Sequence, residues 1–223
     1  MLHKEAASTA LIETLEVLMT IGSIGKHRLA DGTALALQIG HRISVDIDLF
    51  SDEINDYAKI QEELQAKFGK HFERVRDVSS PMCNGVTVLM NNIKTDILDW
   101  PVKFIRPPFV VESIRMAAKE DIVPMKFNTF LSPPEYARYE KKDYIDIAFL
   151  MQEFTLEGMI GFYEAKYPDQ TMVPRLIIEG LQLHEIADKK PMPKMLTQHA
   201  WEETKRQIEE SIERFIHGKV DKF

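Results

Sequence analysis

The stretch that decides the fold reads LADGTALALQIGHRISVDIDLF and runs from Leu29 to Phe50. Gly32 permits a sharp turn and a close approach of the backbone to a ligand. Thr33 is a suitable N-cap for the helical run from Ala34 to Gln38. Because a helix N-terminus exposes unpaired N–H groups and a partial positive charge, this turn is suited to a phosphate.

The strand that follows the helical run carries two carboxylates, Asp46 and Asp48. Strand side chains alternate, so both carboxylates point to one face while Val45, Ile47 and Leu49 point to the other. Two adjacent carboxylates repel each other unless a cation binds them. Mg²⁺ is the natural cation, because it takes hard oxygen ligands, usually one or two carboxylates together with substrate phosphates.

Each of these motifs also has an ordinary structural explanation. A D-x-D pair is usually a solvated strand end, and a Gly-Thr pair before a helix is a weaker signal still. Their combination is more specific: a phosphate-binding turn, a short helix and a metal-binding strand form the outline of a nucleotidyl-transfer site.

The run GTALALQIGHRISVDIDLFS, residues 32–51, resembles the AbiEii/AbiGii-type nucleotidyltransferases. This family is a branch of the polymerase-beta-like superfamily and is linked to bacterial abortive infection and toxin–antitoxin pairs. The resemblance covers roughly residues 27–150, and the remaining tail is only helical in character. The family usually has Gly-Gly where this chain has Asp31-Gly32, so either Asp31 points away from a bound triphosphate or nucleotide binding is weakened.

Composition is that of an ordinary globular protein. The 223 residues are 44% hydrophobic and 28% charged, enough for one large domain or two small ones. No apolar run approaches the ~20 residues that a membrane span needs, and the N-terminus lacks the layout of a signal peptide. Cys83 is the single cysteine, so a reducing cytoplasm is expected.

The formal net charge of −7 argues against broad nucleic-acid binding, which relies on many Lys and Arg contacts to phosphates. A local basic groove stays open beside the alternative of an ordinary mixed surface. The basic residues available for such a groove are Lys26, His27, Arg28, His41, Arg42, Lys119, Lys126, Arg138, Lys141 and Lys142.

Periodicity and turn residues predict an α+β fold. The sequence predicts a helix over residues 4–20 and a second over 53–68, which Ser51 caps and Gly69 ends. Strands are predicted at 71–78, 85–91 and 93–98, with a turn around Met90–Asn92 between the last two. Pro101, Pro107 and Pro108 mark a domain boundary, which divides the chain into a mixed-sheet nucleotidyltransferase-type domain, residues 1–106, and an almost wholly helical half, residues 107–223. Helices are expected at 119–130, 135–153, 155–167, 172–186 and 196–217.

The resemblance implies a third carboxylate on a strand beside the D-x-D strand. Asp96 matches that position, because it is an acidic residue on an otherwise core-like strand. Asp99 is the weaker candidate, since it stands at the strand end before Trp100-Pro101, where a turn carboxylate is common.

A second group of residues lies in the helical half. Read alone, Lys142 and Asp146 form a routine surface pair and Lys126 is a lysine whose stem is buried and whose charge reaches solvent. The resemblance implies more: Lys126 contacts the nucleotide phosphates, and Asp143 lines the same cleft.

These observations together predict an enzyme that transfers NMP from an NTP to an acceptor hydroxyl. Asp46, Asp48 and Asp96 hold one or two Mg²⁺ ions, and Gly32, Thr33 and Lys126 hold the phosphates. Arg42, with His41, either touches the substrate or braces the strand from a buried position, and Ser44 supports the loop. The resemblance implies an RNA acceptor such as tRNA and a cognate antitoxin protein; nucleotidylation of a small molecule and a binding module with little catalysis are the alternatives.

Overall fold

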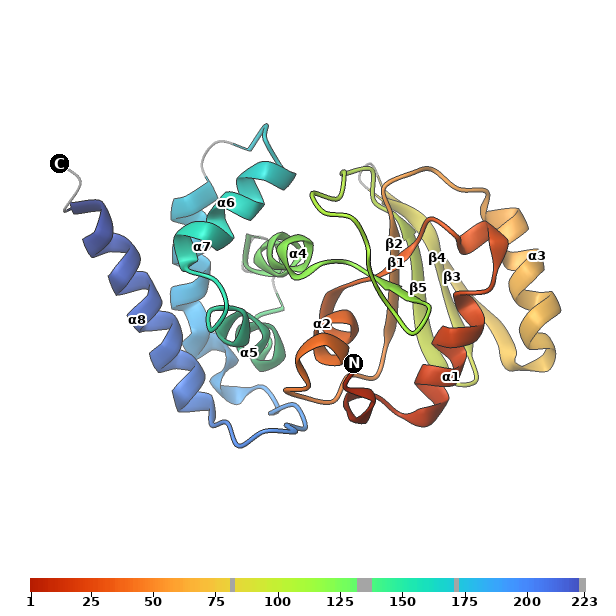
Figure 1. Ribbon diagram of the computed structural model, residues 1–223, viewed down its shortest axis with the longest axis horizontal. Helices are drawn as coiled ribbons and strands as arrows, with labels where there is room; N and C mark the ends of the chain where they lie inside the picture. Colours follow the sequence, from red (N-terminus) through yellow and green to blue (C-terminus); the bar gives the residue numbers. More distant parts are fainter. Residues whose placement is uncertain (81–82, 132–137, 171–172, 221–223) are drawn as a thin grey trace. The chain divides into compact units, whose positions relative to one another are not determined.

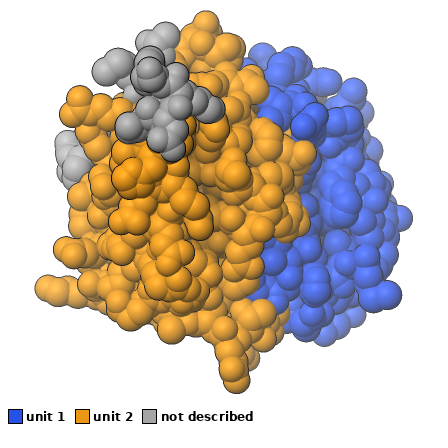
Figure 2. Space-filling view, turned by 60° about the vertical axis from the view of Figure 1, so that its left-hand side comes forward, with its two compact units in different colours: residues 1–118 blue, residues 119–223 orange. Residues whose placement is uncertain are grey.

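The computed structural model describes residues 1–80, 83–131, 138–170 and 173–220. The chain forms two compact units, unit 1 with residues 1–118 and unit 2 with residues 119–223, which Figure 2 distinguishes by colour. Unit 1 contains the sheet and unit 2 is helical (Figure 1). The predicted α+β class is confirmed, and the units divide after residue 118, where the sequence placed a boundary after residue 106.

The described residues of unit 1 form a mixed seven-stranded sheet with the order β3-β4-β5-β2-β1-β7-β6. β2 is parallel to β5 and β1 is parallel to β7, while the other neighbouring pairs are antiparallel. The three strands predicted after Gly69 correspond to β3, β4 and β5. The strands are β1 (Arg28–Leu29), β2 (Ile47–Ser51), β3 (Phe72–Ser80), β4 (Cys83–Met90), β5 (Ile93–Asp99), β6 (Phe109–Val111) and β7 (Ile114–Met116).

The hairpin of β6 and β7 corrects the prediction that the chain is almost wholly helical beyond the prolines. β7 pairs with β1 through Leu29 and Met116, and both Ile114 and Met116 are fully buried. Strands of three residues are too short to show an alternating pattern. Their pairing with β1 therefore could not be seen in the sequence.

Capping residues set where the helices of unit 1 begin. Ser8 accepts a hydrogen bond from the Leu11 amide at 3.2 Å, so the helix predicted for residues 4–20 is instead a 3₁₀ turn, Lys4–Ala6, followed by α1, Thr9–Leu18. The helix predicted to follow Ser51 is α3, Tyr57–Phe68, and its N-cap is Asp56. Ser51 cannot be that cap, because it is the last residue of β2. α3 ends at Gly69, as predicted.

The turn between β4 and β5 is formed by Asn91 and Asn92, as predicted. Both have positive φ, 52° and 62°, which asparagine tolerates better than most residues. This tight connection fixes the antiparallel register of β4 and β5.

The core of unit 1 is built by helices packed on the sheet. α1 contacts β5, and α3 contacts β3 and β4; Figure 1 shows both helices on the same side of the sheet. Inward-facing apolar residues of β2, β4 and β5 alternate with polar residues on the other face. Fully buried core residues include Leu11, Leu15, Leu18, Ile47, Leu49, Ile60, Leu64, Val86, Val88 and Ile97.

Within its described residues, unit 2 has helices as its regular elements, joined by irregular segments, as the sequence predicted. The helix expected at 135–153 begins at Lys141, and residues 135–137 of that prediction lie outside the described residues. The helix expected at 172–186 continues after Gln182 as a 3₁₀ segment, Leu183–Lys189. The helices are α4 (Lys119–Leu131), α5 (Lys141–Leu150), α6 (Leu156–Lys166), α7 (Val173–Gln182) and α8 (Trp201–Val220). Throughout the part of the chain that the structure describes, no helix combines the length and the apolar character that crossing a bilayer requires.

Candidate active site

The acidic pair lies at the start of β2. Asp46 directly precedes the strand, and Asp48 is its second residue. Ile47 and Leu49 are fully buried on the opposite face, which leaves both carboxylates on the same, more accessible side. Val45 was expected on the buried face with Ile47 and Leu49, but its side chain is 67% exposed. The alternation of buried and accessible residues therefore begins at Asp46.

Asp96 stands directly beside Asp48 on the neighbouring strand, as expected. β2 and β5 are parallel, and Asp48 is paired with Asp96 in their register. Neighbouring strands are about 4.8 Å apart and paired residues point to the same face. The two carboxylates are therefore adjacent on one face of the sheet.

The electrostatics of this face favour a bound cation. Burial, together with the charges of Asp31, Asp96 and Asp46, raises the pKa of the Asp48 carboxyl from its ordinary 3.8 to about 7, while Lys94 opposes the shift. Burial and neighbouring negative charge both disfavour the ionised carboxylate, and a bound cation would favour it. We call Asp31, Asp46, Asp48 and Asp96 the acidic cluster.

Two donors that the sequence interpretation did not identify hold Asp96. Thr87 on β4 donates its hydroxyl to Oδ1 of Asp96 at 2.5 Å, and Lys94 Nζ lies 2.5 Å from Oδ2. Burial lowers the pKa of Lys94, but its hydrogen bond to Asp96 and the charges of Asp96, Asp48 and Asp46 outweigh that effect and raise it overall. The i, i+2 spacing of Lys94 and Asp96 was visible in the sequence, whereas Thr87 is brought there by the register of β4 and β5.

The donor set fits a divalent cation in its chemistry. Asp46, Asp48 and Asp96 supply hard carboxylate oxygens on one face, the type that Mg²⁺ prefers. Their side chains do not yet converge: among the residues that the structure describes, no group of three or more His, Cys, Asp or Glu side chains is arranged to hold a metal ion. Both oxygens of Asp96 are instead engaged by Thr87 and Lys94.

The turn before the pair begins α2, Asp31–Ile39, and differs from the prediction in detail. Ala30 is the N-cap residue, so Thr33 lies within the first turn of the helix and is not its cap. Its hydroxyl is 2.5 Å from the Asp46 carbonyl and 2.8 Å from the Ser44 hydroxyl. Thr33 therefore ties the helix to the loop that leads into β2, and Ser44 supports that loop.

Asp31 takes the unusual backbone conformation of this turn. Its φ is 52°, a left-handed value that glycine adopts at no cost and that aspartate tolerates. Its charge acts on Asp48, so Asp31 belongs to the same electrostatic site. Both possibilities that the sequence left open for this carboxylate stay predictions.

His41 and Arg42 are both buried, with exposed fractions of 0% and 3%. Arg42 donates from Nη1 to the Ile43 carbonyl at 3.2 Å. Gly40 before them has φ 75°, and a Cβ at that position would come within 2.4 Å of the His3 ring. These contacts favour a bracing role for the segment over direct contact with the substrate.

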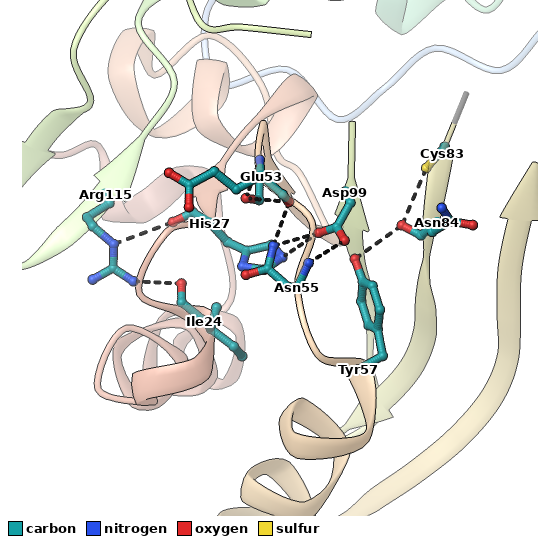
Figure 3. A network of polar contacts seen from close by, with 10 residues as sticks. Ile24, His27, Glu53, Asn55, Tyr57, Cys83, Asn84, Asp99 and Arg115 are labelled. Atoms are coloured by element: carbon teal, nitrogen blue, oxygen red, sulfur yellow. Dashed lines mark hydrogen bonds and ion pairs between the residues drawn. The ribbon is translucent and has the colours of Figure 1, made fainter. Parts of the chain in front are cut away.

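Asp99 belongs to a different, structural network (Figure 3). It accepts hydrogen bonds from the Asn55 amide at 2.8 Å and the Asn55 side chain at 2.7 Å, and its Oδ1 is 3.7 Å from His27 Nε2. Burial lowers the pKa of His27 to about 4, although the charge of Asp99 opposes that shift. Asp99 is on the buried face of β5, so it fixes the loop before α3, as expected of a strand-end carboxylate.

Most of the basic residues considered for a groove are engaged within the fold. Lys26 pairs with Glu53 at 3.4 Å, and Arg28 donates to the Arg106 carbonyl and lies over the Phe104 ring. His27 is buried. These contacts favour the mixed surface over a basic groove in this part of the chain.

Lys126 and Asp143 lie together inside unit 2. Lys126 Nζ, on α4, is 2.9 Å from Asp143 Oδ1 and 2.8 Å from Asp146 Oδ2, both on α5. All three side chains are at most 2% exposed. The predicted partnership of Asp146 with Lys142 is wrong, because the buried face of α5 turns Asp146 toward Lys126. A second buried pair joins Lys166 and Asp121 at 2.9 Å.

Comparisons with known proteins address the family and the fold of the chain. The family model "Nucleotidyl transferase AbiEii toxin, Type IV TA system" matches residues 32–216, well beyond the limit of about residue 150 that the sequence resemblance indicated. No curated protein sequence matches the chain significantly.

Two crystal structures from Helicobacter pylori share the fold. One, of a candidate nucleotidyltransferase, is 17% identical with a TM-score of 0.57 over 96% of this chain and 97% of that chain. The other, of the protein JHP933, is 17% identical with a TM-score of 0.56 over 96% of this chain and 94% of that chain.

Proposed function

Because the chain belongs to the AbiEii nucleotidyltransferase toxin family, we propose that it transfers NMP from an NTP to an acceptor hydroxyl at the acidic cluster of unit 1. The observation that carries this proposal is the pairing of Asp48 with Asp96 on adjacent parallel strands. A nucleotidyltransferase needs carboxylates at one point to hold cations against a triphosphate, and this register supplies them.

Asp46, Asp48 and Asp96 would hold one or two Mg²⁺ ions. When bound, Mg²⁺ neutralises charge that develops on the α-phosphate and on the leaving pyrophosphate. Asp96 takes the proton from the acceptor hydroxyl as the new P–O bond forms and the bond to pyrophosphate breaks. Thr87, which donates to Asp96 at 2.5 Å, orients that carboxylate.

The phosphates would lie at the N-terminus of α2, against Gly32 and Thr33. Thr33 also ties this turn to the Asp46 carbonyl, so phosphate position and carboxylate position are linked. Lys126 and Asp143 form a buried pair within unit 2, and the phosphate-binding role that the resemblance implies for them stays a prediction. Arg42 would support the phosphate-binding segment from its buried position.

The acceptor is proposed to be RNA of the tRNA type in the cytoplasm, where a cognate antitoxin counteracts the enzyme. The association of the family with type IV toxin–antitoxin systems supports the antitoxin, and the RNA acceptor is proposed from the resemblance described above.

The test is incubation with α-labelled NTPs, Mg²⁺ and total RNA. Asp46→Asn and Asp48→Asn should each lower label transfer by at least about a hundredfold, the usual cost of losing a group that stabilises the transition state. Asp169→Asn changes an exposed carboxylate of unit 2 in the same way and should leave transfer unchanged. Equal transfer by Asp46→Asn and wild type would refute the proposal.

One observation favours a second candidate, a nucleotide-binding module with little catalysis. Asp31 adds negative charge beside the proposed phosphate site. Measurable NTP binding with no transfer to RNA or to a mixture of small hydroxyl compounds would support that candidate. Transfer to a small compound but not to RNA would show that the acceptor is a small molecule.

A further inference from the structure

Four charged side chains form a two-by-two arrangement on one face of the sheet. Asp46 and Asp48 are two residues apart at the start of β2, and Lys94 and Asp96 are two residues apart on β5. Asp48 is paired with Asp96, and continuing the same register by two residues brings Asp46 beside Lys94. The arrangement therefore contains three carboxylates and one ammonium group.

The ammonium group of Lys94 lies against the Asp96 carboxylate, where a divalent cation would bind. Lys94 Nζ is 2.5 Å from Oδ2 of Asp96, and the other oxygen of Asp96 accepts a hydrogen bond from Thr87 at 2.5 Å. Both carboxylate oxygens of Asp96 therefore face hydrogen-bond donors. A metal ion that coordinated Oδ2 would meet the positive charge of Lys94 at the same atom.

Lys94 is able to leave this position. Its side chain is 45% exposed, whereas that of Asp96 is 15% exposed. An ammonium group on a flexible four-carbon stem can turn into solvent without disturbing the strand that carries it. Thr87, by contrast, is 2% exposed and fixed within β4.

We propose that Lys94 is the resident counter-ion of the acidic cluster, which a divalent cation must displace from Asp96 in order to bind. This inference rests on the proposed function, since it concerns the cation that the transfer reaction requires. Lys94 stabilises Asp46, Asp48 and Asp96 within that cluster while no cation is bound, and it weakens the affinity of the site for a cation alone. It is a positioning residue, because it acts through Asp96.

The first test measures Mn²⁺ binding by electron paramagnetic resonance without nucleotide. Lys94→Met keeps the length of the side chain and removes its charge, and it should bind Mn²⁺ about three- to tenfold more tightly than wild type. Lys94→Arg keeps a charged donor and should bind no more tightly than wild type. Lys67→Met removes an equal charge from the exposed face of α3 and should match wild type. Equal or weaker binding by Lys94→Met overturns the inference.

The second test separates displacement from a charge effect that acts through space. The side-chain ammonium signal of Lys94, assigned by its loss in Lys94→Arg, is followed by ¹⁵N NMR during a Mg²⁺ titration of the wild-type protein. Displacement predicts a hydrogen-bonded signal that changes toward that of an exposed lysine as Mg²⁺ saturates the site, and Asp96→Asn should produce that exposed signal without Mg²⁺. A signal that stays constant at saturating Mg²⁺ overturns the inference.

These outcomes are distinct from those of the transfer assay. Label transfer that depends on Asp46, combined with unchanged Mn²⁺ affinity in Lys94→Met, would keep the proposed function and overturn the role of Lys94. Tighter Mn²⁺ binding in Lys94→Met without any label transfer would keep the role of Lys94 and overturn the proposed function.

Discussion

At the scale of single residues, Asp31 is the least expected feature of the site. It occupies a left-handed backbone position, with φ 52°, where the related family usually has glycine. It also adds negative charge to the acidic cluster. Both effects are unfavourable, and they can be separated by substitution.

Asp31→Gly should raise the free energy of unfolding by roughly 1 kcal/mol, the cost of a left-handed conformation for a residue with a Cβ. It should also tighten NTP binding about three- to tenfold, because a like charge is removed from the phosphate site. Urea denaturation and a fluorescent NTP analogue measure the two effects. Asp31→Asn is the matched control: it should reproduce the gain in binding and not the full gain in stability. Unchanged NTP affinity in both variants would place Asp31 outside the phosphate site.

The buried ring of His27 makes the stability of the fold depend on pH in the acid range. Its pKa is about 4 in the folded protein, against an ordinary value of 6.5, because burial disfavours the charged ring. A folded pKa below the unfolded one means that the unfolded chain takes up the proton first. Stability is therefore retained above about pH 6.5 and lost as the pH falls toward 4.

Lowering the pH from 7.5 to 5 should reduce the free energy of unfolding of wild type by about 2 kcal/mol more than that of His27→Gln. Urea denaturation at the two pH values measures the cost. His71→Gln, at an exposed histidine, should lose as much stability as wild type. If His27→Gln loses as much as wild type, then His27 is not the buried neutral group described above.

Part of the site could be predicted from single residues. The alternation around Asp46 and Asp48 and the acidic character of Asp96 within a core-like strand were visible in the sequence. The contact of Thr87 with Asp96 was not, because it depends on which residues of β4 and β5 are paired. The sharp turn was expected at Gly32, and the left-handed φ occurs one residue earlier, at Asp31, which composition does not reveal.

At the scale of elements, α4 and α5 bury charge between them. Lys126 contacts Asp143 and Asp146 with all three side chains almost fully buried. Removing one partner of a buried ionic group leaves uncompensated charge and is strongly destabilising.

Lys126→Met should therefore lower the free energy of unfolding by about 3–5 kcal/mol. Adding Asp146→Asn should recover part of that loss, because it removes one of two buried like charges. Lys142→Met, at a half-exposed lysine of α5, should change stability by no more than about 0.5 kcal/mol. A loss below about 1 kcal/mol in Lys126→Met would show that the ammonium group is not needed to stabilise α4 and α5.

The elements were predictable in proportion to their length. α4 and α6 carry enough turns for a period to appear, and β5 has seven residues of alternation. β6 and β7 have three residues each and are stabilised by pairing with a distant strand, which no local pattern reports. The cap at Asp56 was missed for a related reason: Ser51 is a good capping residue by type, but β2 already uses its backbone.

At the scale of the whole molecule, the net charge of −7 limits how RNA can be recognised. Binding to many RNA species relies on numerous cationic contacts to phosphates, and Lys26, Arg28 and Lys119 are already engaged by groups of their own unit. Labelling of total RNA should therefore be confined to a narrow tRNA-sized fraction. Gel electrophoresis of the labelled RNA measures this, with Asp46→Asn giving the background labelling. Label spread over all RNA sizes would contradict the expectation.

The division into a sheet-containing part and a helical part was predictable, since prolines separate two regions of different periodicity. The extent of unit 1 was not, because the hairpin that follows the prolines joins the sheet through β1. The similarity to the AbiEii family extends to residue 216, so it includes most of the helical part as well as most of the sheet.

The proposed function requires that Asp46, Asp48 and Asp96 converge on a divalent cation that contacts the triphosphate. The most direct measurement is a crystal structure with Mn²⁺ and a non-hydrolysable NTP analogue, in which anomalous scattering locates the metal. We expect Mn²⁺ about 2.0–2.3 Å from oxygens of all three carboxylates and from a phosphate oxygen. A bound nucleotide with no metal at these carboxylates, or with metal held elsewhere, would contradict it.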